Sequence, residues 1–192
     1  MSASDIFVYN TEDSVKQSKV VDQPKNYLRL VNENHPLLRE VLAEFDWKNP
    51  PINPNELASA LVDTCKHHHG IGLSANQCGL PYRVFVMGAG EEYVAFFNPK
   101  VIATRDETHM TEGCLSFPFL GLKISRPKEV DVEYQDFNGV TRNATYIGVS
   151  ARCFLHELDH MNGILYTDKA KPLALDYGLK KRHKTLKKLR LI

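Results

Sequence analysis

The chain has 192 residues, of which 43% are hydrophobic, and its formal net charge is +1. These values predict one main domain with a sizeable core, and no run of about 18 apolar residues is present to span a membrane. We expect residues 1–25 to form a polar extension, because they have neither a secretory core nor the acid-poor, arginine-rich composition of a transit peptide. A cytoplasmic location is the expectation that follows.

The first predicted helix begins after Asn53, which is followed by a proline and, at the third helical position, by an acid. This order is typical of a capped helix start. An apolar stripe continues the helix to a run of three histidines, residues 67–69, which we expect to be a solvated helix end. The stripe consists of Leu57, Ala58, Leu61, Val62 and Cys65.

Strand patterns follow at residues 82–87 and 93–97. Further along, Val130, Val132 and Tyr134 alternate toward an Asn138-Gly139 pair, which is typical of a hairpin that returns through residues 140–146. Strands followed by a helix predict an α+β fold.

The C-terminal residues 178–192 contain seven lysines and arginines and no acid, which leaves the rest of the chain net negative by six. Their leucines recur at near-helical spacing, so residues 172–192 are predicted to form a basic segment with an amphipathic helix. Such a helix could dock on its own acidic body or on a partner.

The strongest chemical signal is the block His156-Glu157-Leu158-Asp159-His160. Two histidines four positions apart lie on one face of a helix, so both imidazoles can reach one metal ion. The glutamate beside them is suited to act as a general base, and the pattern indicates metal-assisted hydrolysis.

A third ligand has to lie upstream of this block. Tyr166 stands where a metzincin has its third ligand, and no glutamate follows Glu157. Cys153 shares the helical face but lies about 10.5 Å from His160, too far for one ion, and we expect it to be a small buried hydrophobe. Cys114 and the histidine run remain as candidates.

Three segments together resemble the signature motifs of the peptide deformylase family, in the family's order. They are Gly70-Ile71-Gly72-Leu73-Ser74-Ala75-Asn76-Gln77, Glu112-Gly113-Cys114-Leu115-Ser116 and the block at residues 156–160. The resemblance covers about residues 26–171, the expected catalytic domain, and implies antiparallel β-sheets wrapped around the motif helix. It implies removal of the formyl group from the initiator formyl-methionine of nascent polypeptides, which releases formate.

The resemblance also implies the metal site. Cys114, His156 and His160 would hold one divalent ion with a water in the fourth position. Fe²⁺ is the expected metal, and Zn²⁺, Ni²⁺ or Co²⁺ could substitute for it. Glu157 would carry the proton from water to the leaving amine, and the Gln77 side chain and the Leu115 backbone N–H would hold the oxyanion.

The expected substrate-binding residues lie in the same motifs. Gly70, Ile71 and Gly72 would let the backbone approach the peptide as an edge strand does, although a helix C-cap followed by a turn would use the same residues. The other expected contacts come from Glu112, Gly113 and Arg152.

Arg152 matches a position that borders the methionine pocket in deformylases. We expect its stem to line that pocket while the guanidinium reaches water, or else a plain surface arginine. Asp159 could orient an imidazole or form a hydrogen bond near the helix end. Ser74 stands where the family usually has alanine.

Two other functional classes remain open: a metalloprotease that cuts internal peptide bonds, and a noncatalytic basic-tailed module with a structural metal. Neither explains all three motifs. Four widely spaced cysteines, Cys65, Cys78, Cys114 and Cys153, favour a reducing compartment. The basic tail suggests docking to the ribosome, as the resemblance to bacterial deformylases implies, and no membrane or DNA partner is expected.

Overall fold

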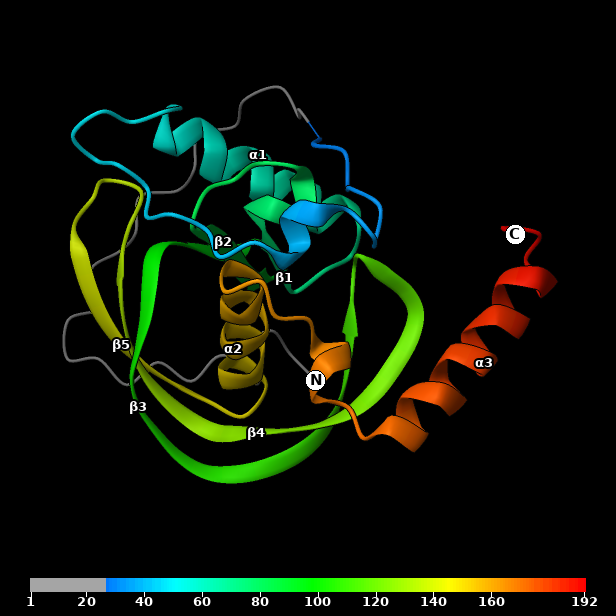
Figure 1. Ribbon diagram of the computed structural model, residues 1–192. Coiled ribbons are helices and arrows are strands. Elements are labelled where there is room, and N and C mark those ends of the chain that lie inside the picture. Colours follow the sequence, from blue (N-terminus) through cyan, green and yellow to red (C-terminus); the bar gives the residue numbers. More distant parts are fainter. Residues whose placement is uncertain (1–26) are drawn as a thin grey trace.

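The computed structural model describes residues 27–192, so the polar extension expected at residues 1–25 lies outside the described part of the chain. Five antiparallel strands form one sheet in the order β1-β2-β3-β4-β5. The sheet curves around a helix that carries the histidine motif (Figure 1). This is the α+β fold that the sequence predicted, with a single continuous sheet in place of several.

The strands are β1 (Gly72–Ser74), β2 (Val84–Ala89), β3 (Glu92–Cys114), β4 (Phe117–Gln135) and β5 (Thr141–Ile147). The α-helices are α1 (Pro54–His67), α2 (Val149–Met161) and α3 (Pro172–Lys188), and the 3-10 helices are η2 (Pro36–Arg39), η3 (Ala75–Cys78) and η4 (Tyr166–Lys169).

Helix α1 forms where its sequence signals predicted it. The side chain of Asn53 accepts hydrogen bonds from the backbone N–H groups of Asn55 and Glu56, at 3.0 and 3.4 Å. The whole predicted stripe is buried, against strands β1 and β2. His69 has a φ of 54°, a left-handed conformation that turns the chain after the helix and leads it into β1.

Strands β3 and β4 are much longer than the sequence indicated, at 23 and 19 residues. Their register shifts between Phe97 and Lys100, between Val101 and Ala103, and between Glu112 and Cys114. Such bulges increase local bending and twist, and they accompany the curvature of the hairpin around α2 (Figure 1). The last bulge lies at Cys114, beside the motif helix.

Helix α2 is enclosed on nearly all sides, because ten of its thirteen residues are buried. Phe154 packs against three rings of the sheet, with centroids 5.2 Å from Phe85, 5.4 Å from Phe96 and 5.9 Å from Tyr146. Close packing of this kind permits little displacement of a helix. The histidine pair is therefore held on a rigid element.

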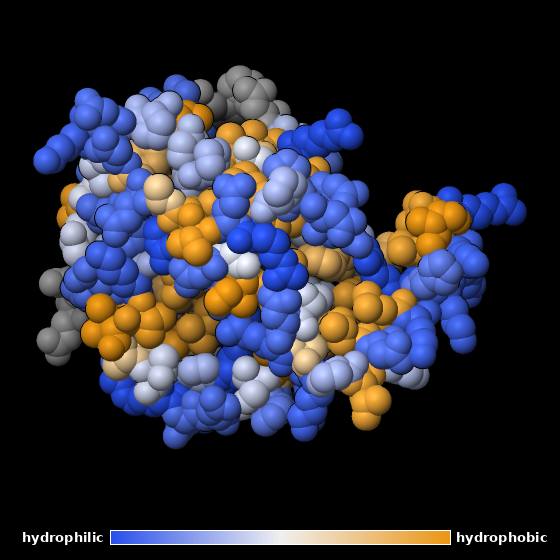
Figure 2. Space-filling model, viewed as in Figure 1, coloured by the Kyte–Doolittle hydropathy of each residue, from blue (hydrophilic) through white to orange (hydrophobic). Residues whose placement is uncertain are grey.

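Helix α3 contacts the body as far along as Arg182, and its C-terminal end projects from the body (Figure 1). A Cβ on Gly178 would lie 2.9 Å from Leu122 Cδ2 and 3.0 Å from Leu120 Cδ1, so the helix sits directly on β4. Arg182 donates to the carbonyl of Pro118 at 2.9 Å and pairs with Glu33. The projecting part carries both polar and apolar side chains (Figure 2). In residues 27–192, no helix is long and apolar enough to cross a membrane.

Candidate active site

Cys114, His156 and His160 come together beside the last bulge of the β3–β4 hairpin. Their ligand atoms all lie within 4.8 Å of one another, and Cys114 Sγ lies 3.3 Å from His160 Nε2. The histidine run at residues 67–69 is not part of this group. Between the two upstream candidates, the geometry therefore favours Cys114 as the third ligand.

The donor set fits a divalent transition-metal ion, since a thiolate and two imidazoles are typical ligands for one. His160 is almost fully buried, and burial lowers its pKa well below the usual value, which keeps the imidazole neutral as a ligand must be. Burial also lowers the pKa of His156, but hydrogen bonds with Cys114 and Glu112 outweigh it and raise the pKa to about 10. An ion would have to displace that proton.

A buried ion cluster surrounds the other side of His156. Glu112 Oε2 lies 3.1 Å from His156 Nδ1, and Glu112 Oε1 accepts from Arg126 Nε at 2.7 Å and from Arg152 Nη1. Arg126 also donates to Asp159 at 2.6 Å. The cluster thus joins β3, β4 and α2, and it orients the His156 ring with Nε2 left for the metal.

Two expectations for α2 are corrected by this cluster. Arg152 is only 5% exposed and donates to Glu112 and to the carbonyls of Ile124 and Thr108, so the predictions that its guanidinium reaches water or lies on the surface are wrong. Asp159 binds Arg126, so the prediction that it orients an imidazole is wrong, and the alternative of a hydrogen bond near the helix end is confirmed. Glu112 occupies the orienting position instead, because the wrapped sheet brings β3 against this face of the helix.

Glu157 lies at the meeting of α2 and β1. It is buried, burial raises the pKa of its carboxyl, and Oε2 accepts a hydrogen bond from Ser74 Oγ at 2.6 Å. A Cβ on Gly72 would lie 2.5 Å from Glu157 Oε1, so only glycine leaves room for the carboxylate there. The raised pKa and the burial are features of a general base in a protected site.

The glycine segment does not cap helix α1, because the C-cap is His68 and the left-handed position after it is His69. Among the described residues 27–192, β1 pairs with β2 alone, which places β1 at the edge of the sheet. The carbonyl of Gly70 accepts from Tyr93 Oη at 2.7 Å, and Ile71 is 44% exposed. An edge strand with an exposed apolar side chain is suited to pairing with an extended peptide.

The side-chain amide nitrogen of Gln77 points toward the candidate metal ligand Cys114. Its Oε1 accepts from the backbone N–H of Ser74 at 2.9 Å, while Nε2 lies 3.3 Å from Cys114 Sγ and 3.1 Å from Ser116 Oγ. The oxygen contact fixes the orientation of the amide. Leu115 follows Cys114 directly in the turn between β3 and β4. Gly113 precedes Cys114, and apart from the neighbouring residues the nearest atom to a Cβ added at Gly113 would be the carbonyl oxygen of Leu120, at 3.9 Å.

The family model for polypeptide deformylase matches residues 27–175. The chain belongs to this family. A peptide deformylase of Thermotoga neapolitana is 42% identical over 113 residues, which cover 58% of this chain and 69% of the relative. A deformylase of Finegoldia magna is 37% identical over 145 residues, 74% of this chain and 88% of the relative.

Solved deformylases share the fold as well as the sequence. A peptide deformylase from Synechococcus elongatus, crystallised in complex with actinonin, has a TM-score of 0.77 and 29% identity and covers 86% of this chain and 92% of its own. The deformylase of Thermotoga maritima has a TM-score of 0.70 and 34% identity, with 77% and 99% covered. These comparisons bear out the family resemblance and the fold expected from it.

One important residue of the candidate site, Arg126, was missed from the sequence. It continues an alternation of buried side chains on β4 that runs through Leu120, Leu122 and Ile124. Because strand side chains alternate between faces, this period of two places the arginine on the buried face. A buried arginine requires acidic partners, so the pattern could have indicated an internal ion cluster.

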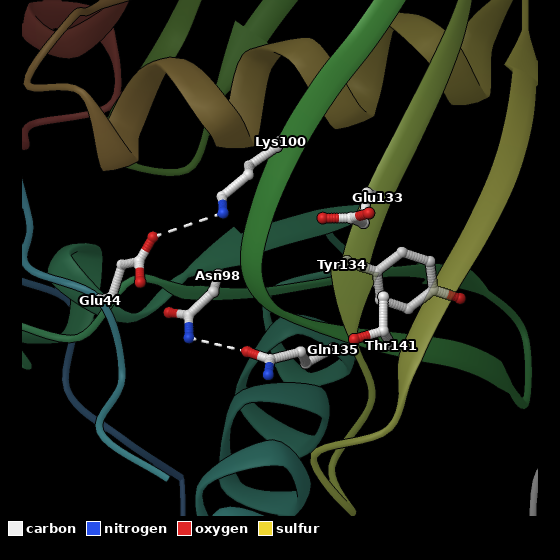
Figure 3. A pocket seen from close by; sticks show the side chains of 7 residues that line it. All are labelled: Glu44, Asn98, Lys100, Glu133, Tyr134, Gln135 and Thr141. Atoms are coloured by element: carbon white, nitrogen blue, oxygen red, sulfur yellow. Dashed lines mark hydrogen bonds and ion pairs between the residues drawn. The ribbon is translucent and has the colours of Figure 1, made fainter.

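A separate polar depression of about 240 Å³ lies at the other end of the hairpin (Figure 3). Glu44 and Lys100 approach each other across it at 3.7 Å, and Asn98 donates to Gln135 at 2.9 Å. The other lining residues are Glu133, Tyr134 and Thr141. None of the predicted site residues lines it, so it takes no part in the chemistry assigned to the motif.

Proposed function

We propose that this chain removes the N-formyl group from the initiator formyl-methionine of nascent polypeptides by metal-dependent hydrolysis, releasing formate. The observation that carries the proposal is the convergence of Cys114, His156 and His160 beside the buried carboxylate of Glu157. Membership of the deformylase family supports the reaction, and the convergence supports the assignment of its residues.

The ion held by Cys114, His156 and His160 would polarise the formyl oxygen and lower the pKa of the attacking water. Fe²⁺ is the proposed native metal, with Zn²⁺, Ni²⁺ or Co²⁺ able to replace it. Within residues 27–192, no fourth histidine, cysteine or acid joins the group. An incomplete ligand set is typical of catalytic sites, whereas structural sites are closed by four protein ligands.

The protein's own groups would divide the remaining work. Glu157 would take a proton from water and deliver it to the amine that leaves. Gln77 Nε2 and the Leu115 N–H would donate to the oxyanion, and loss of one such donor typically lowers the rate by about 10² to 10³.

The peptide would be bound by main-chain groups near the metal. Gly72 in β1, with Gly70 and Ile71 directly before the strand, would pair with the peptide along the edge of β1 that no other described strand occupies, and Gly113 would leave space beside it. We assign Glu112 and Arg152 an indirect role, because their side chains are already engaged in the buried cluster. Through that cluster they would hold His156 in place.

The decisive experiment compares three substrates with anaerobically purified enzyme: a formyl-methionyl peptide, its acetylated analogue and casein. We expect turnover of the formyl peptide alone. Cleavage of casein would indicate a protease, and no turnover of any substrate by metal-loaded protein would indicate a structural metal site.

The site assignment is tested separately by metal content. Single alanine substitutions at Cys114, His156 and His160 should each reduce the metal stoichiometry. Glu157→Ala should retain the metal and lose about 10² to 10⁴ in rate, because it removes a base and no ligand. Wild-type metal content in all three ligand variants would overturn the assignment.

We further propose that the enzyme works in the cytoplasm and docks on the ribosome through α3. The C-terminal half of this helix, residues 181–188, contains four exposed lysines, and lysines bind RNA phosphates with a strong dependence on salt. Truncation would also remove Arg182, which ties α3 to the body. Substitution of the four lysines by alanine is therefore the sharper test. They are Lys181, Lys184, Lys187 and Lys188.

This lysine variant should sediment less with ribosomes and should keep its activity on a short formyl peptide. A matched variant removes four exposed lysines from the body, Lys48, Lys100, Lys123 and Lys128, and should sediment like the wild type. Equal sedimentation of both variants at every salt concentration would contradict docking through α3.

A further inference from the structure

Ser74 is a fully buried residue that contacts the carboxylate of Glu157. Its Oγ lies 2.6 Å from Glu157 Oε2 and 3.3 Å from the backbone carbonyl of the same residue. A hydroxyl has one proton to donate. The shorter contact favours the side-chain oxygen, because 2.6 Å lies in the usual range of an O–H···O hydrogen bond and 3.3 Å lies outside it.

The carboxylate has little other support around it. Glu157 is only 4% exposed, and Ser74 Oγ is the side-chain donor that the described residues supply to it. Its second oxygen, Oε1, lies against the backbone of Gly72, whose missing Cβ makes the space. A directional hydrogen bond to one oxygen fixes the orientation of a buried carboxylate more firmly than packing alone does.

The main chain of Ser74 makes a second and separate contact. Its N–H donates to Gln77 Oε1 at 2.9 Å and so turns Gln77 Nε2 toward Cys114. One residue at the end of β1 therefore touches both side chains that were assigned to the reaction, one through its hydroxyl and one through its backbone.

We propose that Ser74 is a positioning residue, whose hydroxyl holds Glu157 Oε2 so that Oε1 is presented to the proton that moves from water to the leaving amine. This inference rests on the proposed function, since it assumes that Glu157 is the base. Ser74 does not touch the substrate and exchanges no proton with it. Its effect is on the orientation of the carboxylate, which must be correct for efficient proton transfer.

The test is Ser74→Ala, which removes the hydroxyl and leaves the N–H that binds Gln77. We expect kcat to fall on the order of tenfold, the usual effect of losing a hydrogen bond to a charged group, with KM within about twofold. Metal content should stay at the wild-type level. A matched control is Thr64→Val, which removes another buried hydroxyl, bonded to Leu28 and Ala60, and should leave kcat unchanged.

A double-mutant cycle separates positioning from general damage. In the Glu157→Ala background, Ser74→Ala should cause no further loss, because no carboxylate remains to be oriented. Crystal structures provide a readout independent of activity: Glu157 should occupy one conformer in the wild type and more than one in Ser74→Ala. A normal kcat in Ser74→Ala, or an equal loss in both backgrounds, would overturn the inference. Inactive wild-type enzyme would instead overturn the proposed function.

Discussion

Substitution of Glu112 by glutamine tests the buried ion cluster directly. Four donors surround the carboxylate: Arg126 Nε at 2.7 Å, Arg126 Nη2 at 2.9 Å, Arg152 Nη1, and His156 Nδ1 at 3.1 Å. Glutamine keeps the shape but removes the charge. It also turns an NH₂ donor toward groups that are themselves donors.

The expected loss of unfolding free energy in Glu112→Gln follows from the contacts that each partner of Glu112 keeps. Arg126 keeps Asp159, but Arg152 keeps only backbone carbonyls, so one buried guanidinium loses its sole acidic partner within the described residues. Breaking a buried pair in this way typically costs about 3 to 5 kcal/mol of unfolding free energy. Loss of the acceptor at His156 Nδ1 should also weaken metal binding by about 10- to 100-fold.

The dependence on pH has a definite sign. Burial raises the pKa of Glu112, but hydrogen bonds from His156 and Arg126 outweigh it and lower the pKa from 4.5 to about 2. A carboxyl with a depressed folded-state pKa stabilises the fold above its unfolded pKa, and this stabilisation is lost as the pH falls through the folded value. The difference between wild type and Glu112→Gln should therefore shrink between pH 4.5 and pH 2.

The assay is urea unfolding at pH 7 and at acidic pH, with metal titrations alongside. A matched control is Glu129→Gln, whose carboxylate is 30% exposed and pairs with Arg105 at the surface. Surface pairs contribute about 0 to 1 kcal/mol. If Glu112→Gln unfolded with the same free energy as this control, the cluster would not be the structural support described above.

Two further predictions concern the surroundings of α2. Gly72→Ala should lower kcat by about 10² to 10⁴, because its Cβ would lie 2.5 Å from Glu157 Oε1, whereas Gly121→Ala meets only one methyl group at 3.3 Å and should stay active. Unchanged kinetics in Gly72→Ala would show that the carboxylate is not confined. Burial raises the pKa of Cys65 and of Cys78 to about 12, so iodoacetamide at pH 7.5 should alkylate both only in urea, as peptide mass spectrometry would show.

Local signals predicted the parts of the fold that depend on neighbouring residues. The cap at Asn53 and the stripe that follows it specified α1, because capping and helical periodicity act within a few positions. The Asn138-Gly139 pair specified the β4–β5 hairpin for the same reason, and Gly139 has the positive φ, 76°, that such a turn requires.

The full length of the β3–β4 hairpin could not be predicted from local sequence signals. On β3 the bulges interrupt the alternation of inward and outward residues, and on β4 Arg126 and Lys128 interrupt the apolar positions between Ile124 and Val130. Only residues 93–97 and 130–134 of this hairpin were therefore predicted as strands. Helix α3 was predicted from its charge and leucine spacing, but its anchor was not. The contact of Gly178 with Leu120 and Leu122 joins residues more than fifty positions apart.

The errors on α2 have one physical origin. Sequence reasoning gave the helix one buried face and placed Arg152 in contact with water, as is usual for a helix at the surface of a domain. A helix enclosed by a curved sheet has almost no solvent-exposed face, so its buried charges need partners on the sheet, and Arg152 and Asp159 need opposite charges. Glu112 on β3 and Arg126 on β4 supply them. The hairpin that encloses the motif helix therefore also provides the charges that hold the metal-binding histidine in place.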